Sequence, residues 1–208
     1  MIEIIRLWET VNQLAKTETS GYQNEDEFNN DVKAVQDSLM SLSSVDGANQ
    51  SWIDIFDPFA KSESLSINSQ GIASKPTDYY RGRTGEIDGQ PCYPIKVNEK
   101  DMFRTSAIRN TVNVYYQEDG VLKFLPTRVA TCNFSYLRKP LPASIVLTPV
   151  STPDEDYLTP TVGADLEWDD NVFNLFVYMM LERLGVEMKD TLSREFANFG
   201  IQRELAKT

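Results

Sequence analysis

The sequence predicts an α+β fold, in which an N-terminal helical hairpin and C-terminal helices pack with an antiparallel β region and an extended acidic arm. Apolar residues recur at helical spacing near both ends of the chain, which is typical of amphipathic helices. Short segments in the middle alternate apolar and polar residues between turn residues, which is typical of strands. A length of 208 residues suits one core, so we expect a single domain over residues 1–208.

The helical hairpin is predicted over residues 1–46. Ile4 and Trp8 lie on the apolar face of its first helix. Asn24, followed three residues later by Glu27, forms a capping box, so the second helix begins there. Gly21 allows a turn between the helices, and we expect the two to pack antiparallel.

The β region is predicted over residues 75–140, and its close strand spacing favours an antiparallel meander over βαβ units. The glycines of Gly82-Arg83-Thr84-Gly85 predict a flexible hairpin tip. Pro140 ends the last strand directly after the pair Arg138-Lys139, because proline has no N–H to donate to a ladder. The strand-like segments are Tyr79–Arg83, Pro91–Val97, Met102–Arg104, Thr111–Tyr116, Val121–Pro126 and Val129–Arg138.

Residues 141–170 contain four prolines and seven acidic residues with no Lys or Arg, so we expect an extended acidic arm or a surface loop. C-terminal helices are predicted over residues 170–206. The first runs to Leu184 and is apolar nearly all round, so it must be buried in the core or between subunits. A final helix is predicted from Asp190.

The composition limits the available chemistry. The chain has no histidine, which excludes Ser-His-Asp triads, Cys-His pairs and His-ligated metals. The two cysteines, Cys92 and Cys132, are 40 residues apart, and Cys132 is expected to be a buried thiol. We find no leader and no apolar window of about 18 residues, and therefore expect a soluble protein made in a reducing cytoplasm.

The net charge of −11 is unevenly distributed. Residues 75–139 contain eleven Lys and Arg against seven Asp and Glu, a net charge of +4, which leaves −15 for the remainder. A protein this acidic is poorly suited to gripping nucleic acid phosphates.

Two acidic patterns are candidates for metal chemistry. Asp154 with Glu187 and Lys189 matches the loose Pro-Asp and Glu-x-Lys pattern of a nuclease superfamily, in which two carboxylates hold Mg²⁺ and a lysine positions the attacking water. Its context, a Pro-rich loop and a break between helices, disfavours that interpretation. The acids between Asp165 and Asp170 could ligate Ca²⁺, but acids that lead into a helix N-terminus are also favoured by the helix dipole. We expect no cofactor and no metal.

Several short segments, taken in their order along the chain, are similar to those of a known family of proteins. Near the N-terminus these are Leu14-Ala15-Lys16, Gly21-Tyr22, Glu27-Phe28-Asn29 and Ala34-Val35-Gln36. In the C-terminal half they are Phe124-Leu125-Pro126, Tyr136-Leu137-Arg138-Lys139-Pro140, Leu166-Glu167-Trp168 and the helix Asn171 to Leu184 with Gly185-Val186. In this order the chain resembles head–tail connector, or neck ring, structural proteins of short-tailed, crAss-like bacteriophages.

The resemblance implies a structural virion protein with no catalytic residues. Such a protein would be assembled in the host cytoplasm into a ring of probably twelve copies, between the portal protein and other neck or tail proteins. Genomic DNA would be retained by the ring and pass through its lumen without sequence-specific binding, and no membrane would be involved. An acidic lumen would keep DNA mobile by repelling its phosphates.

We predict five residues at contacts between subunits: Arg138, Lys139, Trp168, Phe173 and Phe176. For the basic pair among them, ion pairs to an acidic neighbour are favoured over phosphate contacts because the chain has an excess of acid. The alternatives for the whole protein are a metal-dependent nuclease that uses Asp154, Glu187 and Lys189, and a soluble scaffolding or binding module.

Overall fold

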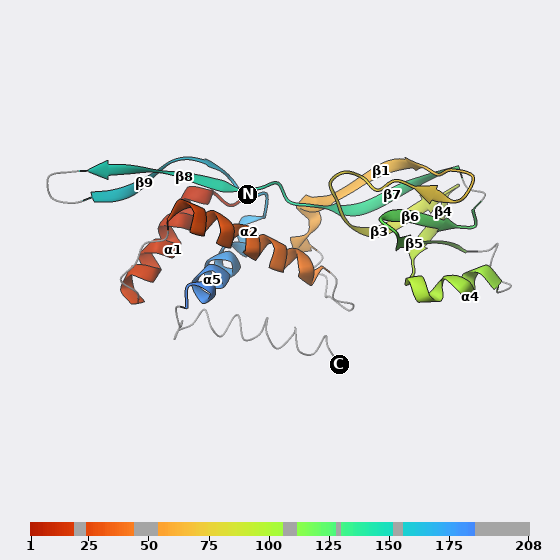
Figure 1. The fold of residues 1–208 in the computed structure, drawn as a ribbon, viewed down its shortest axis with the longest axis horizontal. Helices are drawn as coiled ribbons and strands as arrows, with labels where there is room; N and C mark the ends of the chain where they lie inside the picture. The colour runs from red at the N-terminus through yellow and green to blue at the C-terminus, as the bar shows by residue number, and fades with distance from the viewer. Residues whose placement is uncertain (19–23, 44–53, 106–111, 128–129, 152–155, 186–208) are drawn as a thin grey trace. The chain divides into compact units, whose positions relative to one another are not determined.

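The computed structural model describes residues 1–18, 24–43, 54–105, 112–127, 130–151 and 156–185. It confirms an α+β fold, with helices and a curled, mostly antiparallel sheet (Figure 1). The chain divides into two compact units, which we call the terminal unit (Met1–Pro58 and Pro140–Thr208) and the central unit (Phe59–Lys139). From the sequence we expect both to be parts of one domain.

The terminal unit is built from helices and one β-hairpin. Its elements are α1 (Ile4–Glu18), α2 (Glu25–Leu42), β8 (Ser144–Ser151), β9 (Asp156–Ala164), η4 (Asp170–Val172) and α5 (Phe173–Arg183). Both α1 and α2 pack on α5, and the capping box at the start of α2 is confirmed, with Glu27 N–H donating to Asn24 Oδ1 over 2.9 Å. The antiparallel pairing predicted for the two N-terminal helices stays a prediction.

The apolar character of α5 is explained by its partners inside the same unit. Phe176, Met180 and Leu181 are fully buried. The ring of Trp168 packs edge to face against Phe176 at 5.7 Å and against Phe56 at 6.0 Å. Burial of these large side chains against one another supplies the core of the terminal unit.

The extended acidic arm or surface loop predicted over residues 141–170 is not confirmed, because most of that segment forms a β-hairpin. Strands β8 and β9 form a two-stranded antiparallel sheet, with a register shift between Val146 and Leu147 (Figure 1). Two of the prolines, Pro149 and Pro160, lie within these strands. Proline is tolerated in a strand where its missing N–H is not needed by the ladder, which composition alone does not reveal.

The central unit is a seven-stranded sheet with the order β1-β7-β3-β4-β5-β6-β2. All pairs are antiparallel except β4 with β5, which corrects the prediction of a simple meander. The segment predicted as the strand Met102–Arg104 is helix α4, which lies in the crossover between these parallel strands. A short helix, η1 (Asp57–Phe59), spans the boundary between the units. The elements of the central unit are β1 (Ala60–Ser66), β2 (Ile72–Ala73), β3 (Tyr79–Ile87), β4 (Gln90–Pro94), η2 (Val97–Glu99), α4 (Lys100–Thr105), β5 (Asn113–Glu118), β6 (Val121–Leu125) and β7 (Thr131–Arg138).

The core of the central unit is aromatic, and two glycines of β3 make room for it. Gly82 and Gly85 lie inside β3 rather than at a hairpin tip, which corrects the sequence-based prediction. A Cβ on Gly82 would lie 2.8 Å from Phe134 Cζ and still closer to Tyr115 Oη. A Cβ on Gly85 would lie 2.8 Å from Cys132 Sγ. The strand therefore needs residues without side chains at both positions.

The prediction that Cys132 is a buried thiol is confirmed, and Cys92 is also free and buried in this core. A hydrogen bond with the thiol of Cys132, together with burial, raises the pKa of Cys92. The final helix predicted from Asp190 lies outside the described residues. Among the helices that the structure describes, none is long and apolar enough to cross a membrane.

Candidate functional site

A hydrogen-bonded cluster joins β1, the segment before β3, and β7 in the central unit. Lys61 Nζ donates to Asp78 Oδ2 over 2.8 Å, and Tyr136 Oη donates to Asp78 Oδ1 over 2.8 Å. The bond from Lys61 lowers the pKa of the Asp78 carboxyl most, and the bond from Tyr136 lowers it as well. Burial and, to a smaller extent, the bond to Asp78 raise the pKa of the Tyr136 phenol to about 12. At neutral pH the carboxylate is therefore ionised and the phenol is protonated.

This cluster lies at one end of a groove of about 480 Å³. One wall is strand β1, and the other is the segment of residues 74–78. Lys75 Nζ lies 5.2 Å from the centre of the Tyr79 ring, and partial burial lowers the pKa of this lysine. Lys75 forms no ion pair with any residue that the structure describes. The groove therefore offers hydrogen-bonding groups and a positive charge in a partly dehydrated setting.

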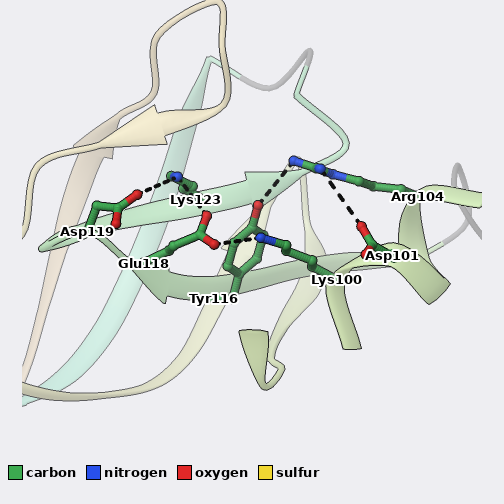
Figure 2. A network of polar contacts seen from close by, with 7 residues as sticks. All are labelled: Lys100, Asp101, Arg104, Tyr116, Glu118, Asp119 and Lys123. Carbon is green, nitrogen blue, oxygen red and sulfur yellow. Dashed lines mark hydrogen bonds and ion pairs between the residues drawn. The ribbon is translucent and has the colours of Figure 1, made fainter. Parts of the chain in front are cut away.

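A second polar cluster joins α4 to the hairpin of β5 and β6 (Figure 2). Glu118 accepts from Lys100 Nζ over 2.5 Å and from Lys123 Nζ over 2.7 Å, and these two bonds hold the pKa of its carboxyl down at about 2. Arg104 donates to Tyr116 Oη over 3.3 Å from the other end of α4. The contacts tie the crossover helix to β5 and β6, and the charges are matched within the cluster. We interpret this cluster as structural.

The basic pair predicted as an interface lies at the end of β7. The Arg138 guanidinium lies 5.6 Å from the centre of the Phe59 ring and donates to the Lys139 carbonyl over 3.2 Å. Lys139 N–H donates to the Asp78 carbonyl over 2.7 Å, while the residue itself is exposed. Ala60 pairs with Leu137, so the start of β1 and the end of β7 lie at the same end of the sheet. Both chain connections to the terminal unit, before Phe59 and after Lys139, therefore leave the sheet at that end.

The three aromatic residues predicted at subunit contacts lie in the terminal unit, apart from the basic pair. Trp168 and Phe176 have no exposed surface, and Phe173 is only 7% exposed. Arg6 covers Phe173, with its guanidinium 4.0 Å from the ring centre, and also forms an ion pair with Asp170 at 2.8 Å. The sequence predicts that these apolar rings are buried, and residues of the same chain bury them. Their role between subunits stays a prediction.

Each acidic residue proposed for a Ca²⁺ site has a partner of its own in the terminal unit. Asp165 Oδ1 accepts from Ile4 N–H at the start of α1, and Glu167 accepts from Leu141 N–H. Asp169 caps η4, and Asp170 pairs with Arg6 as described above. No cluster of potential metal ligands is found among the described residues. The nuclease candidates Asp154, Glu187 and Lys189 lie outside the described residues.

The charge asymmetry seen in the sequence follows the division into units. The central unit, Phe59–Lys139, contains twelve Lys and Arg and eight Asp and Glu, for a net charge of +4. The terminal unit contains eight Lys and Arg and twenty-three Asp and Glu, for a net charge of −15. The two units thus carry net charges of opposite sign.

The groove beside β1 is not predicted from the sequence, because the predicted β region begins at residue 75 and β1 (Ala60–Ser66) lies before it. The alternation in Lys61-Ser62-Glu63-Ser64-Leu65-Ser66 was the available signal for an edge strand. No model of a known protein family matches the chain, and no curated protein does.

Proposed function

We propose that this protein is a structural component of a phage head–tail connector, which assembles as a ring between the portal protein and the tail. The observation that carries the proposal is the opposite net charge of the two units, +4 and −15. A ring requires a heterologous interface, in which one surface of a subunit meets a different surface of the next. Units of opposite sign favour head-to-tail contacts and disfavour contacts between like surfaces.

The resemblance described above supplies the biological setting of the proposal. In that setting the acidic terminal unit contributes the lumen surface, where repulsion of phosphates keeps the passing DNA mobile. The basic central unit contributes contacts to acidic surfaces of neighbouring subunits. Lys139, exposed at the end of β7, is the residue we assign to such a contact.

The test is the mass of the assembled protein, measured alone and with the portal protein of the same phage. We expect a discrete ring of about twelve copies, or a ring that forms when the portal protein is added. Lys139→Glu should weaken assembly, whereas Lys96→Glu, at an exposed position between β4 and η2, serves as the matched control. A monodisperse monomer that does not bind the portal protein would contradict the proposal.

A further inference from the structure

Strand β1 is an edge strand whose outer side is open. It pairs only with β7, and Ile67 N–H donates to the Ala130 carbonyl at the end of this ladder. Backbone groups alternate in direction along an antiparallel strand, so those of Ser62, Ser64 and Ser66 point away from β7. The described residues provide no backbone partner for these groups.

The groove lined by β1 and residues 74–78 has room for an added strand next to β1. One residue of a strand fills roughly 150 Å³, given the usual spacings along a strand, between strands and between sheets. The groove of about 480 Å³ therefore holds about three residues next to β1. An extended segment bound there would hydrogen-bond to the outward backbone groups of Ser64 and Ser66, which line the groove, and this is recognition by strand addition.

The hairpin of the terminal unit has one open edge of its own. The outer edge of β8 is covered by α2, because Ile145 N–H donates to Asn29 Oδ1 over 2.9 Å and Leu147 N–H donates to Glu25 Oε2 over 2.8 Å. Pro149, next on that edge, has no N–H to offer. The open edge of the hairpin is therefore the outer edge of β9.

Within β9, the part that can add to a sheet is short. Pro160 cannot donate to a new neighbour, which limits regular pairing to Asp156–Thr159. That length matches what the groove holds. The segment carries one acid, Asp156, and the groove presents Lys75 without an ion pair among the described residues, beside Glu63 and the ion pair of Lys61 with Asp78.

We propose that Asp156–Thr159 of β9 in one copy adds to the outer edge of β1 in a second copy, so that the central sheet of one subunit is extended by the hairpin of its neighbour. This inference rests on the proposed ring function, because it identifies the contact between neighbouring subunits of that ring. Each copy offers one β9 edge and one β1 groove, which are different surfaces. Repeated pairing therefore propagates head to tail, as a ring requires.

Cross-linking of mixed single variants tests the pairing directly. One preparation carries Ser64→Cys and the other Thr159→Cys, and the two are mixed and treated with a flexible bis-maleimide. We expect a covalent dimer containing one copy of each variant. Gln90→Cys in place of Ser64→Cys is the control, since Gln90 is exposed on β4, and wild-type protein reports any reaction of the buried Cys92 and Cys132. A yield no higher than that of the Gln90→Cys mixture would overturn the inference.

A proline on the β1 edge gives a second, independent measurement. Ser64→Pro removes an outward N–H, and we expect the concentration for half assembly to rise roughly fivefold to tenfold. Ser64→Ala keeps that N–H and should assemble like the wild type. An unchanged midpoint for a folded Ser64→Pro variant would overturn the inference, and if that variant does not fold the cross-link decides. Wild-type protein that assembles without the β1–β9 cross-link would leave the ring proposal standing, whereas monomeric wild-type protein would end the ring proposal.

Discussion

At the scale of single residues, the central unit depends on the absence of a side chain at Gly82. Its neighbours, Phe134 and Tyr115, are buried rings packed edge to face at 5.0 Å, so neither can move without disturbing the other. Extra atoms in a well-packed core force side chains away from their preferred rotamers.

We expect Gly82→Ala to destabilise the central unit by about 1–3 kcal/mol. Tyr115→Phe, which removes the closest atom, should recover part of this loss when combined with Gly82→Ala. Hydrogen exchange of β3 and β7 peptides is the suitable measurement, because Trp8, Trp52 and Trp168 all lie outside the central unit and their fluorescence would not report on it. A loss equal in the single and double variants would show that contact with the Tyr115 hydroxyl is not the cause.

The carboxyl of Glu118 predicts a pH dependence of the central unit. Its pKa is lowered from 4.5 to about 2 by the bonds from Lys100 and Lys123, so the ionised form is favoured by folding. A group with a lowered folded-state pKa stabilises the protein fully above its unfolded pKa, and this contribution is lost as the pH falls through the folded pKa.

The difference in free energy of unfolding between wild type and Glu118→Gln should therefore be constant above pH 5 and should shrink between about pH 4.5 and pH 2. Urea unfolding across this range, followed by hydrogen exchange of the β5 and β6 peptides, measures it. Asp119→Asn is the matched control, because Asp119 is 81% exposed and contacts Lys123 at 3.3 Å. A difference that is independent of pH down to pH 2 would contradict the assignment.

At the scale of elements, the side chain of Asn29 replaces a strand on the edge of β8. Its amide donates to the Ile145 carbonyl over 3.1 Å and accepts from the Ile145 N–H over 2.9 Å, as a neighbouring backbone would. This pair of bonds fixes the hairpin on α2 and protects an edge that could otherwise pair with another chain.

We expect Asn29→Ala to lower the free energy of unfolding of the terminal unit by about 1–3 kcal/mol, because two partly buried backbone groups lose their partners. Asn30→Ala, one residue along α2 and exposed, should change it by less than about 0.5 kcal/mol. Urea unfolding followed by tryptophan fluorescence reports on this unit. Equal effects of the two substitutions would argue against a role for Asn29 as a surrogate strand.

At the scale of the whole molecule, the division of charge between units predicts that assembly depends on salt. The Debye length falls from about 10 Å at 0.1 M to about 3 Å at 1 M ionic strength, so attraction between the +4 and −15 units of neighbouring copies is screened.

The concentration for half assembly should therefore rise with ionic strength, and analytical ultracentrifugation at a series of NaCl concentrations measures it. Sedimentation of Lys139→Glu under the same conditions should show a weaker dependence, since one cation of the contact is reversed. Assembly that strengthens with NaCl would point to an apolar interface instead of an electrostatic one.

Short-range sequence patterns predicted the helix ends and apolar helices of this structure but did not predict the β8–β9 hairpin. The capping box at Asn24 and the apolar run of α5 depend on neighbours a few residues away, and both predictions are confirmed. The β8–β9 hairpin was missed because proline and acid content normally indicate a loop. The outward position of Pro149 on a strand edge depends on register, which no local pattern encodes.

The sequence by itself determined the α+β class, the burial of Cys132 and the separation of acidic ends from a basic middle, because composition and short-range periodicity carry these properties. Three features follow from the tertiary structure alone: β4 and β5 are parallel, Gly82 packs against aromatic rings while Gly85 packs against Cys132, and a groove is lined by β1. These features arise where residues far apart in the chain meet. Strand order and register, rather than local propensity, determine which backbone groups are left unpaired.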